Sequence, residues 1–317
     1  MSGVPVAAVE RLLASAEDSA AGSLRPGWPE LLDVAVAAEH APRFKVDVSF
    51  AVLGVGEGGA RFSVNDKGEE AAFRERLRAN ASALGIPPTL LEAFLSLSPP
   101  GAVQTTLGVK WRDDGGAPER VTLYHEELFR SSQGSSIIAA LFAAAGVAKA
   151  PPPRRGLQPG AVCVDITDGS VVGLKDYWIA TETDRDAAIT LPEPLEAFRR
   201  ATPFSTERGT RRYLVARRFT AEGHPAGHKL LWMSEAHDSA AAERAWAFVD
   251  RARRDLKLPP SRPARAMDVL RDSWCHPALL YPDLVSLDLD PDERPCGLTV
   301  YVSLKGTVPL KGDSASG

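Results

Sequence analysis

The sequence predicts an α+β fold in which five β-hairpins, separated by helices, close into one ten-stranded antiparallel barrel. The first observation is that β-branched and aromatic residues fill five pairs of short segments, each joined by a turn rich in glycine, aspartate or proline. The second is that amphipathic helical patterns lie between these pairs. The third is rhythm, because the hairpins begin at intervals of roughly 50–70 residues, a suitable length for a repeated αββα unit.

The hairpin strands are predicted from runs of Val, Ile, Thr, Tyr, Phe and Trp. They comprise residues 44–53 and 60–64, 104–112 and 120–124, 161–166 and 171–178, 211–219 and 228–233, and 284–289 and 297–303. Helical spacing of apolar residues predicts helices at 6–21, 28–40, 71–84, 89–97, 135–147, 195–201, 239–256 and 265–274. Ser239 suits the N-cap of the helix 239–256.

Closure is expected because a sheet of ten antiparallel strands tends to curl, and closing it removes its unpaired edges. Helices packed outside leave an interior wide enough for a small ligand. The alternative is an open α+β protein with two sheets. The proline-rich stretch 150–155 is a candidate domain linker, but the hairpin rhythm continues across it, which favours a loop between repeats. We therefore expect one domain over residues 1–306 and a flexible polar tail at 307–317.

Composition narrows the classes of partner. The 317 residues are 44% hydrophobic and 25% charged, as in globular proteins with a sizeable core. A net charge of -4 without a polybasic run gives no support for binding nucleic acid. Neither an apolar run of about 18 residues nor a signal-peptide pattern is present, so no membrane association is expected. The three cysteines lack CxxC spacing, which argues against a zinc site or disulfide framework and fits a cytoplasmic location.

Short motifs recur at matching places in the hairpins. Val46-Asp-Val-Ser49 is followed by Ala60-Arg-Phe-Ser-Val-Asn65, and Val164-Asp-Ile-Thr-Asp-Gly169 is followed by Leu174-Lys-Asp-Tyr177. Residues 121–124 and 298–301 look like further copies of the return strand. Together with the αββα rhythm, these motifs resemble the ABBA-type aromatic prenyltransferases, whose fold is called the PT barrel. The motifs are closest to the indole, or tryptophan dimethylallyltransferase, branch.

The resemblance implies a transferase that moves a dimethylallyl or longer prenyl group from its diphosphate to an aromatic acceptor such as an indole. It implies no cofactor, no requirement for Mg²⁺, and a monomer or homodimer. The sequence departs from the family's pattern at several positions. Thr122 and Thr299 stand where a basic residue is expected, and His228 and Trp232 stand at the basic and tyrosine positions of the fourth hairpin. The chain is therefore either a divergent enzyme or a barrel that has lost the activity.

Prenyl transfer sets three chemical demands. The leaving diphosphate needs fixed cations and hydrogen-bond donors, and the carbocation needs aromatic faces that exclude water. Because side chains two apart on a strand share a face, the motifs predict which residues point inward together. The predicted diphosphate ligands are Arg61 and Lys175, with Lys110 and Arg212 as weaker candidates. The predicted aromatic shield comprises Tyr124, Tyr177, Trp232 and Tyr301, for each of which ordinary burial under a helix is the alternative.

The third demand is a base for the proton released by the acceptor, and Asp47 is the candidate. Asp47 shares a strand face with Ser49, while Val48 and Phe50 share the other. The apolar face should pack under the helices, which puts Asp47 in the lumen. A solvated aspartate on an edge strand is the alternative.

Two further motifs could be signs of a different function, but neither has the required spacing. Asp113-Asp114 precedes two glycines and is a turn rather than a metal-binding helix motif, and the glycines of 54–59 lack the dinucleotide-binding order. Rival functions that keep the barrel are prenylation of a phenolic or peptide acceptor, and an inactive barrel that binds a hydrophobic small molecule. Three or more basic side chains converging in the lumen would favour diphosphate chemistry, and one or none would favour a binder.

Overall fold

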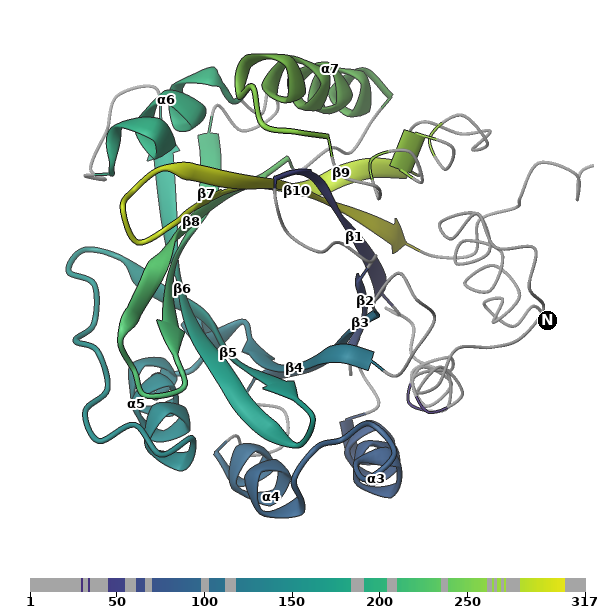
Figure 1. The fold of residues 1–317 in the computed structure, drawn as a ribbon, viewed down its shortest axis with the longest axis vertical. Coiled ribbons are helices and arrows are strands. Elements are labelled where there is room, and N and C mark those ends of the chain that lie inside the picture. Colours follow the sequence, from purple (N-terminus) through teal and green to yellow (C-terminus); the bar gives the residue numbers. More distant parts are fainter. Residues whose placement is uncertain are drawn as a thin grey trace, which may run out of the picture.

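Ten antiparallel strands form one closed barrel in the computed structural model (Figure 1). The structure describes residues 30, 34, 45–54, 61–65, 70–97, 103–111, 118–183, 191–203, 210–234, 239–260, 264, 267–268, 271 and 280–305. The strands are β1 (Lys45–Gly54), β2 (Arg61–Asn65), β3 (Gln104–Trp111), β4 (Pro118–Glu126), β5 (Gln158–Thr167), β6 (Ser170–Thr183), β7 (Thr210–Thr220), β8 (Pro225–Met233), β9 (Leu280–Leu289) and β10 (Pro295–Lys305). Each strand pairs with its neighbours in sequence, and β1 closes the barrel against β10. The predicted barrel is confirmed, and the alternative with two sheets is wrong.

The turn between β5 and β6 shows how the sequence sets a hairpin. Asp168 and Gly169 have φ angles of 48° and 72°, and Thr167 pairs with Ser170 on either side of them. A two-residue turn with both φ angles positive matches the right-handed twist of its strands, and Asp-Gly is a preferred sequence for it. The turn therefore sets the register where the hairpin begins, and a shift between Ile166 and Asp165 then places Asp165 opposite Gly173 and Cys163 opposite Lys175.

The described helices all lie outside the barrel (Figure 1). They are α3 (Glu70–Asn80), α4 (Pro88–Ser96), the 3₁₀ helix η1 (Leu128–Arg130), α5 (Gly134–Ala144), α6 (Glu193–Ala201) and α7 (Ser239–Asp255). Each longer helix turns an apolar stripe to the sheet, as α5 does with Ile138, Leu141 and Phe142. In the part of the chain that the structure describes, no helix is both long and apolar enough to cross a membrane.

Several predicted segments fall outside the described residues. These are the helices at 6–21 and 28–40, apart from the helical Glu30 and Val34, and the tail at 307–317. In the segment predicted as helix 265–274, the described residues Met267, Asp268 and Arg271 are helical. The proline-rich stretch is described and packs on the barrel, where Arg217 Nη2 donates to the Pro152 carbonyl over 2.9 Å.

Two separate clusters of buried apolar side chains line the two faces of the sheet. The larger cluster lies between the outer face and the helices and includes Phe50, Val52, Trp178 and Leu230. The smaller cluster lies on the inner face and combines two tyrosines with small and aliphatic side chains. Its members are Tyr124, Ala161, Cys163, Tyr177, Ala216 and Leu231. This inner face is where the polar and charged side chains described next are found.

Candidate active site inside the barrel

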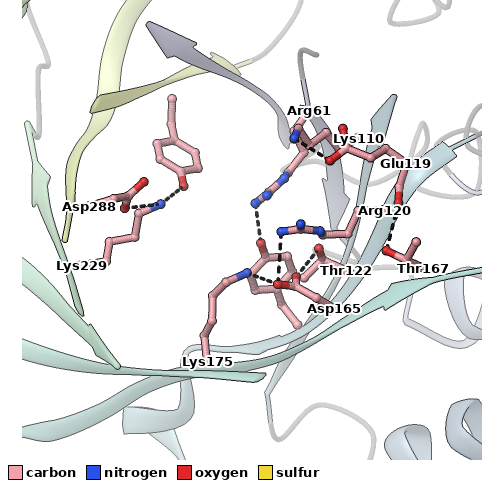
Figure 2. Close-up of polar contacts among 12 residues, drawn as sticks. Arg61, Lys110, Glu119, Arg120, Thr122, Asp165, Thr167, Lys175, Lys229 and Asp288 are labelled. Carbon is pink, nitrogen blue, oxygen red and sulfur yellow. Dashed lines mark hydrogen bonds and ion pairs between the residues drawn. The ribbon is translucent and has the colours of Figure 1, made fainter. Parts of the chain in front are cut away.

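Five basic side chains from five strands point into the barrel, and we call them the cation layer. They are Arg61 of β2, Lys110 of β3, Arg120 of β4, Lys175 of β6 and Lys229 of β8. Figure 2 shows Lys229 on one side of the lumen, Arg61, Lys110 and Arg120 on the other side, and Lys175 between them. The five are close enough to influence one another, because Arg61 and Arg120 act to lower the pKa of Lys110, and Arg61 acts in the same direction on Lys229. The layer is therefore one electrostatic site built by chain segments far apart in sequence.

Asp165 on β5 holds two members of the cation layer. Its Oδ2 accepts a hydrogen bond from Lys175 Nζ at 2.5 Å and lies 3.6 Å from Arg120 Nη1. Its Oδ1 accepts a hydrogen bond from Thr122 Oγ1 at 2.8 Å. Burial alone would raise the pKa of Asp165, but Lys175, Arg120 and Arg61 outweigh it and hold the pKa well below its usual range. Asp165 is therefore ionised whenever the protein is folded near neutral pH.

Arg61 has a neutral phenol rather than a carboxylate as its hydrogen-bond partner. Its Nη1 donates to Tyr124 Oη over 3.0 Å, and its buried Nε has no hydrogen-bond partner among the described residues. Burial opposes the charge, but Tyr124, Tyr301 and Asp165 outweigh it and leave the pKa of Arg61 above its ordinary value. The buried Nε of Arg120 likewise has no partner among the described residues. A buried N–H donor without an acceptor is costly, so the two guanidinium groups favour an anion or ordered water in the lumen.

Two lysines of the cation layer each have a carboxylate of their own. Lys110 Nζ lies 2.9 Å from Glu119 Oε1, yet burial still keeps the pKa of Lys110 below its ordinary value. Lys229 Nζ lies 3.1 Å from Asp288 Oδ1 and donates to Tyr301 Oη over 3.1 Å. Burial lowers the pKa of Lys229, but Asp288 and Tyr301 raise it more, so the net shift is upward. Among the described side chains, the five cations of the layer are thus paired with three carboxylates, so the layer itself has an excess of positive charge.

Three predicted aromatic residues stand on the inner wall beside the cation layer. The rings of Tyr124 and Tyr177 lie 6.5 Å apart and are tilted by 47°, and burial raises the pKa of both phenols. Tyr301 lies on the opposite wall with Lys229 Nζ 5.5 Å from its ring centroid. Burial would raise the pKa of Tyr301 too, but Lys229 and Arg61 lower it below the ordinary value. Neutral aromatic faces are therefore available on two sides of the lumen.

The prediction for the fourth hairpin is wrong in register by one residue. Trp232 does not face the lumen but packs under α7, where its ring centroid lies 5.0 Å from that of Phe248. His228 shares that outer face, and burial and the nearby Arg154 lower its pKa. The inward positions are taken by Lys229 and Leu231 instead. A shift of one residue exchanges the two faces of a strand, because its side chains alternate.

Arg212 is also misplaced as a diphosphate ligand. In the pairing of β6 with β7, Lys175 lies opposite Arg218, whereas Arg212 lies opposite Thr181, six residues further along. Six residues of extended strand span about 20 Å. Arg212 therefore belongs to the other end of the barrel and not to the cation layer. Lys110 and Lys175, by contrast, are both in the layer.

Asp47 lies in β1, and its backbone pairs with Ser63 of β2 and Ser303 of β10. Its side chain lies outside the described residues. The described part of the strand follows the expected alternation, because Phe50 and Val52 belong to the outer cluster, and Ser49 pairs with Arg61. The role of Asp47 stays a prediction.

Sequence reasoning did not identify Arg120, Asp165, Lys229 or Asp288 as site residues. Arg120 and Asp165 share a strand face with Thr122 and Cys163 respectively, so strand alternation could have found both once the inner face was known. Lys229 could have been found by the outward-apolar rule, since Leu230 and Trp232 are the more apolar face of β8. Among the described residues, no group of three or more His, Cys, Asp or Glu side chains is placed to hold a metal ion.

The fold of the chain is similar to that of solved prenyltransferases. The 5-dimethylallyltryptophan synthase from Streptomyces coelicolor superimposes with a TM-score of 0.60 at 19% identity, over 92% of this chain and 94% of that chain. The prenyltransferase PriB, solved as a ternary complex with L-tryptophan and dimethylallyl thiolodiphosphate, gives a TM-score of 0.59 at 16% identity, over 94% and 95%. A 6-dimethylallyltryptophan synthase from Micromonospora olivasterospora gives 0.56 at 18% identity, over 94% and 91%.

These likenesses cover nearly the whole chain and confirm the predicted resemblance to the tryptophan branch at the level of the fold. No protein-family model matches the sequence, and no curated protein matches it significantly. The chain therefore has this barrel fold with a sequence far from the proteins that share it.

Proposed function

We propose that this protein transfers a dimethylallyl or longer prenyl group from its diphosphate to a small aromatic acceptor, with an indole such as tryptophan as the acceptor to test first. The observation that carries the proposal is the cation layer. Five basic side chains converge inside the barrel, which favours diphosphate chemistry over the binding of a neutral hydrophobic molecule. The barrels with the same fold that act on tryptophan support the same choice.

The diphosphate would bind between Arg61 and Arg120 on one side and Lys229 on the other, with Lys175 between them. The unpartnered Nε atoms of Arg61 and Arg120 would gain acceptors from its oxygens. When the allylic C–O bond breaks, negative charge grows on the leaving diphosphate. Fixed cations stabilise that charge more than they stabilise the bound substrate, and this difference lowers the barrier.

The prenyl cation would lie against the ring faces of Tyr124, Tyr177 and Tyr301. Two of these tyrosines are hydrogen-bonded to the cation layer, because Arg61 donates to Tyr124 and Lys229 donates to Tyr301. These hydrogen bonds would hold the two rings beside the allylic C–O bond that breaks. The small and aliphatic side chains next to them, including Ala161, Ala216 and Leu231, would leave room for a planar acceptor and keep water away from the cation.

Proton removal completes the reaction, and Asp47 is the proposed base. Cationic side chains take the place of a metal in this scheme, so Mg²⁺ should be dispensable and no cofactor is needed. We propose that one domain over residues 1–306 does this as a cytoplasmic monomer or homodimer.

The test is product formation by the full chain. Purified protein is incubated with dimethylallyl diphosphate and L-tryptophan, indole, tyrosine or a tryptophan-containing dipeptide, with either EDTA or Mg²⁺, and products are identified by mass spectrometry. Prenylated L-tryptophan or prenylated free indole formed in EDTA supports the proposal. Product only with tyrosine or the peptide would favour the phenolic or peptide alternative. Absence of binding to both dimethylallyl diphosphate and inorganic pyrophosphate would contradict any diphosphate chemistry.

A further inference from the structure

Asp165 is a carboxylate at the centre of a site that otherwise suits an anion. Its side chain is 5% exposed, and its Oδ2 lies 2.5 Å from Lys175 Nζ. The two residues lie diagonally across the hairpin of β5 and β6, in which Asp165 pairs with Gly173 and Cys163 pairs with Lys175. Thr122 donates to the other carboxylate oxygen, so the carboxylate is held from both sides. Asp165 is thus fixed in position among the five basic residues of the cation layer.

This position makes Asp165 a competitor of any bound phosphate. A phosphate oxygen at hydrogen-bond distance from Lys175 Nζ lies at most about 5.5 Å from Asp165 Oδ2. At an effective dielectric constant of about 20, two negative charges at that separation repel each other by an amount worth more than about tenfold in affinity. Arg120 is shared in the same way, since its Nη1 lies 3.6 Å from the same oxygen. Lys175 and Arg120 can therefore bind the diphosphate only in competition with Asp165.

We propose that Asp165 is the residue that sets the release of diphosphate: it holds Lys175 and Arg120 in the empty lumen, shares them with the bound diphosphate, and takes them back when the product leaves. The inference rests on the proposed function, because it assigns a role within the same diphosphate site. It explains why a site that needs positive charge keeps a fully ionised carboxylate at its centre. Without that carboxylate, the layer would hold the product diphosphate too tightly for rapid turnover.

The experiment is the binding and release of inorganic pyrophosphate by the wild-type chain and by Asp165→Asn. Asparagine keeps the shape of the side chain, and its Oδ1 can still accept from Thr122 or Lys175, so the change removes charge rather than contact. We expect pyrophosphate to bind at least about 10-fold more tightly in calorimetry and to dissociate correspondingly more slowly in stopped-flow displacement. In turnover, we expect stronger product inhibition by pyrophosphate and a lower kcat, with kcat/KM for the prenyl diphosphate unchanged or raised.

Glu92→Gln is the matched control for net charge. Glu92 lies on α4 and pairs with Arg78 at an exposed site outside the barrel. This variant makes the same change in net charge as Asp165→Asn and should bind pyrophosphate as the wild type does. If Asp165→Asn does not fold, Asp165→Ser removes the same charge and should change affinity in the same direction.

The outcomes separate the inference from the proposed function. Wild-type binding with equal or weaker binding by the Asp165 variants overturns the inference alone, because Asp165 would then only position Lys175. Binding by neither protein overturns the diphosphate site and the inference together. Tighter binding by the Asp165 variants, with Glu92→Gln unchanged, supports the inference.

Discussion

Arg61 reaches Tyr124 across a strand that has no side chain at the crossing point. The hydrogen bond from Arg61 Nη1 to Tyr124 Oη is 3.0 Å long, and β3 lies between the two strands that carry these residues. The β3 residue between Arg61 and Tyr124 on the inner face of the barrel is Gly108. A Cβ there would lie 3.4 Å from the Tyr124 ring and 3.5 Å from Arg61 Cδ. The glycine therefore makes room for a contact between a predicted diphosphate ligand and a predicted shield residue.

Filling that space should disturb the diphosphate site. Gly108→Val should displace Arg61 or Tyr124 and weaken pyrophosphate binding by up to about 1.5–3 kcal/mol, the contribution of the charged hydrogen bond that Arg61 would lose. Gly108→Ala should have a smaller effect, because its Cβ meets its neighbours at 3.3 Å or more. Calorimetry with pyrophosphate measures both. Equal affinities in all three proteins would mean that the Arg61–Tyr124 contact does not contribute to anion binding.

Removing a cation should have a larger and more local effect. Arg61→Ala and Lys175→Ala should each weaken pyrophosphate binding by about 1.5–3 kcal/mol, the scale of a charged hydrogen bond. Lys175→Ala should be the more severe, because it also leaves Asp165 with less compensation. Arg212→Ala is the matched control, since Arg212 lies at the other end of the barrel. If Arg212→Ala weakens binding as much as the other two, the site lies elsewhere in the lumen.

The barrel could be predicted from the sequence because its cues are local. Each hairpin has its own turn, such as Asp168 and Gly169, and its own run of β-branched residues. Closure then followed from the number of strands alone. The copies of the return strand, with Tyr124, Tyr177 and Tyr301, all lie on the inner face because alternation is strict within one strand.

The prediction missed two other parts of the site for different reasons, one within a strand and one between strands. Trp232 was assigned to the lumen by matching its position to a family motif, although Leu230 and Trp232 form the more apolar face of β8. The outward-apolar rule, applied here as it was to Asp47, would have placed Lys229 inside. Alternation places Asp165 on the inner face with Cys163, but its part in the site depends on its distances to Lys175 and Arg120, which one strand alone does not predict.

The two faces of the sheet predict different phenotypes for aromatic substitutions. Trp232 is 3% exposed beneath α7, so Trp232→Ala should lower the free energy of unfolding by about 3–5 kcal/mol. The activity of the folded fraction should change little. Tyr301→Ala should instead open the lumen beside Lys229, and hydrolysis of the prenyl diphosphate should rise relative to prenylation of the acceptor. Urea unfolding and the ratio of prenyl alcohol to prenylated product measure the two effects. A normal ratio in Tyr301→Ala would exclude Tyr301 from the shield.

His125 predicts how stability depends on pH. It is fully buried on the outer face of β4, stacked on Phe94 with ring centroids 3.9 Å apart, and its Nε2 lies 2.9 Å from the Phe94 carbonyl oxygen. Burial lowers its pKa to about 4 from an ordinary 6.5. As the pH falls from 6.5 to 4, the unfolded chain takes up a proton that the folded protein does not, so the free energy of unfolding decreases. The loss should be roughly 2–4 kcal/mol, from about 1.4 kcal/mol per pH unit.

His125→Gln should remove that part of the pH dependence, because the glutamine amide can donate to the Phe94 carbonyl and does not titrate. Urea unfolding at several pH values between 4 and 7 gives the two slopes, and the exposed His224→Gln serves as a control that should follow the wild type. Parallel curves for wild type and His125→Gln would show that His125 is not the group responsible.

Asp47 carries the most mechanistic content of the remaining predictions. Its backbone pairs with Ser63, the neighbour of Arg61 on the inner face of β2, so its register position lies next to the cation layer. A carboxylate there could accept a hydrogen bond from an indole N–H and then take the proton released when the ring regains aromaticity. Asp47→Asn keeps the shape and removes the base.

We expect Asp47→Asn to lower turnover by about 10²–10⁴-fold, the usual contribution of a positioned general base. Pyrophosphate binding should stay nearly intact, because the cations that hold the diphosphate are untouched. Asp176→Asn is unsuitable as a control, since Asp176 is buried and ion-paired with Arg217. The exposed Asp292, whose substitution by Asn removes the same charge, is the better match. Wild-type turnover in Asp47→Asn would assign proton removal to another group. A parallel loss of pyrophosphate affinity would show that Asp47 supports the diphosphate site rather than acting as the base.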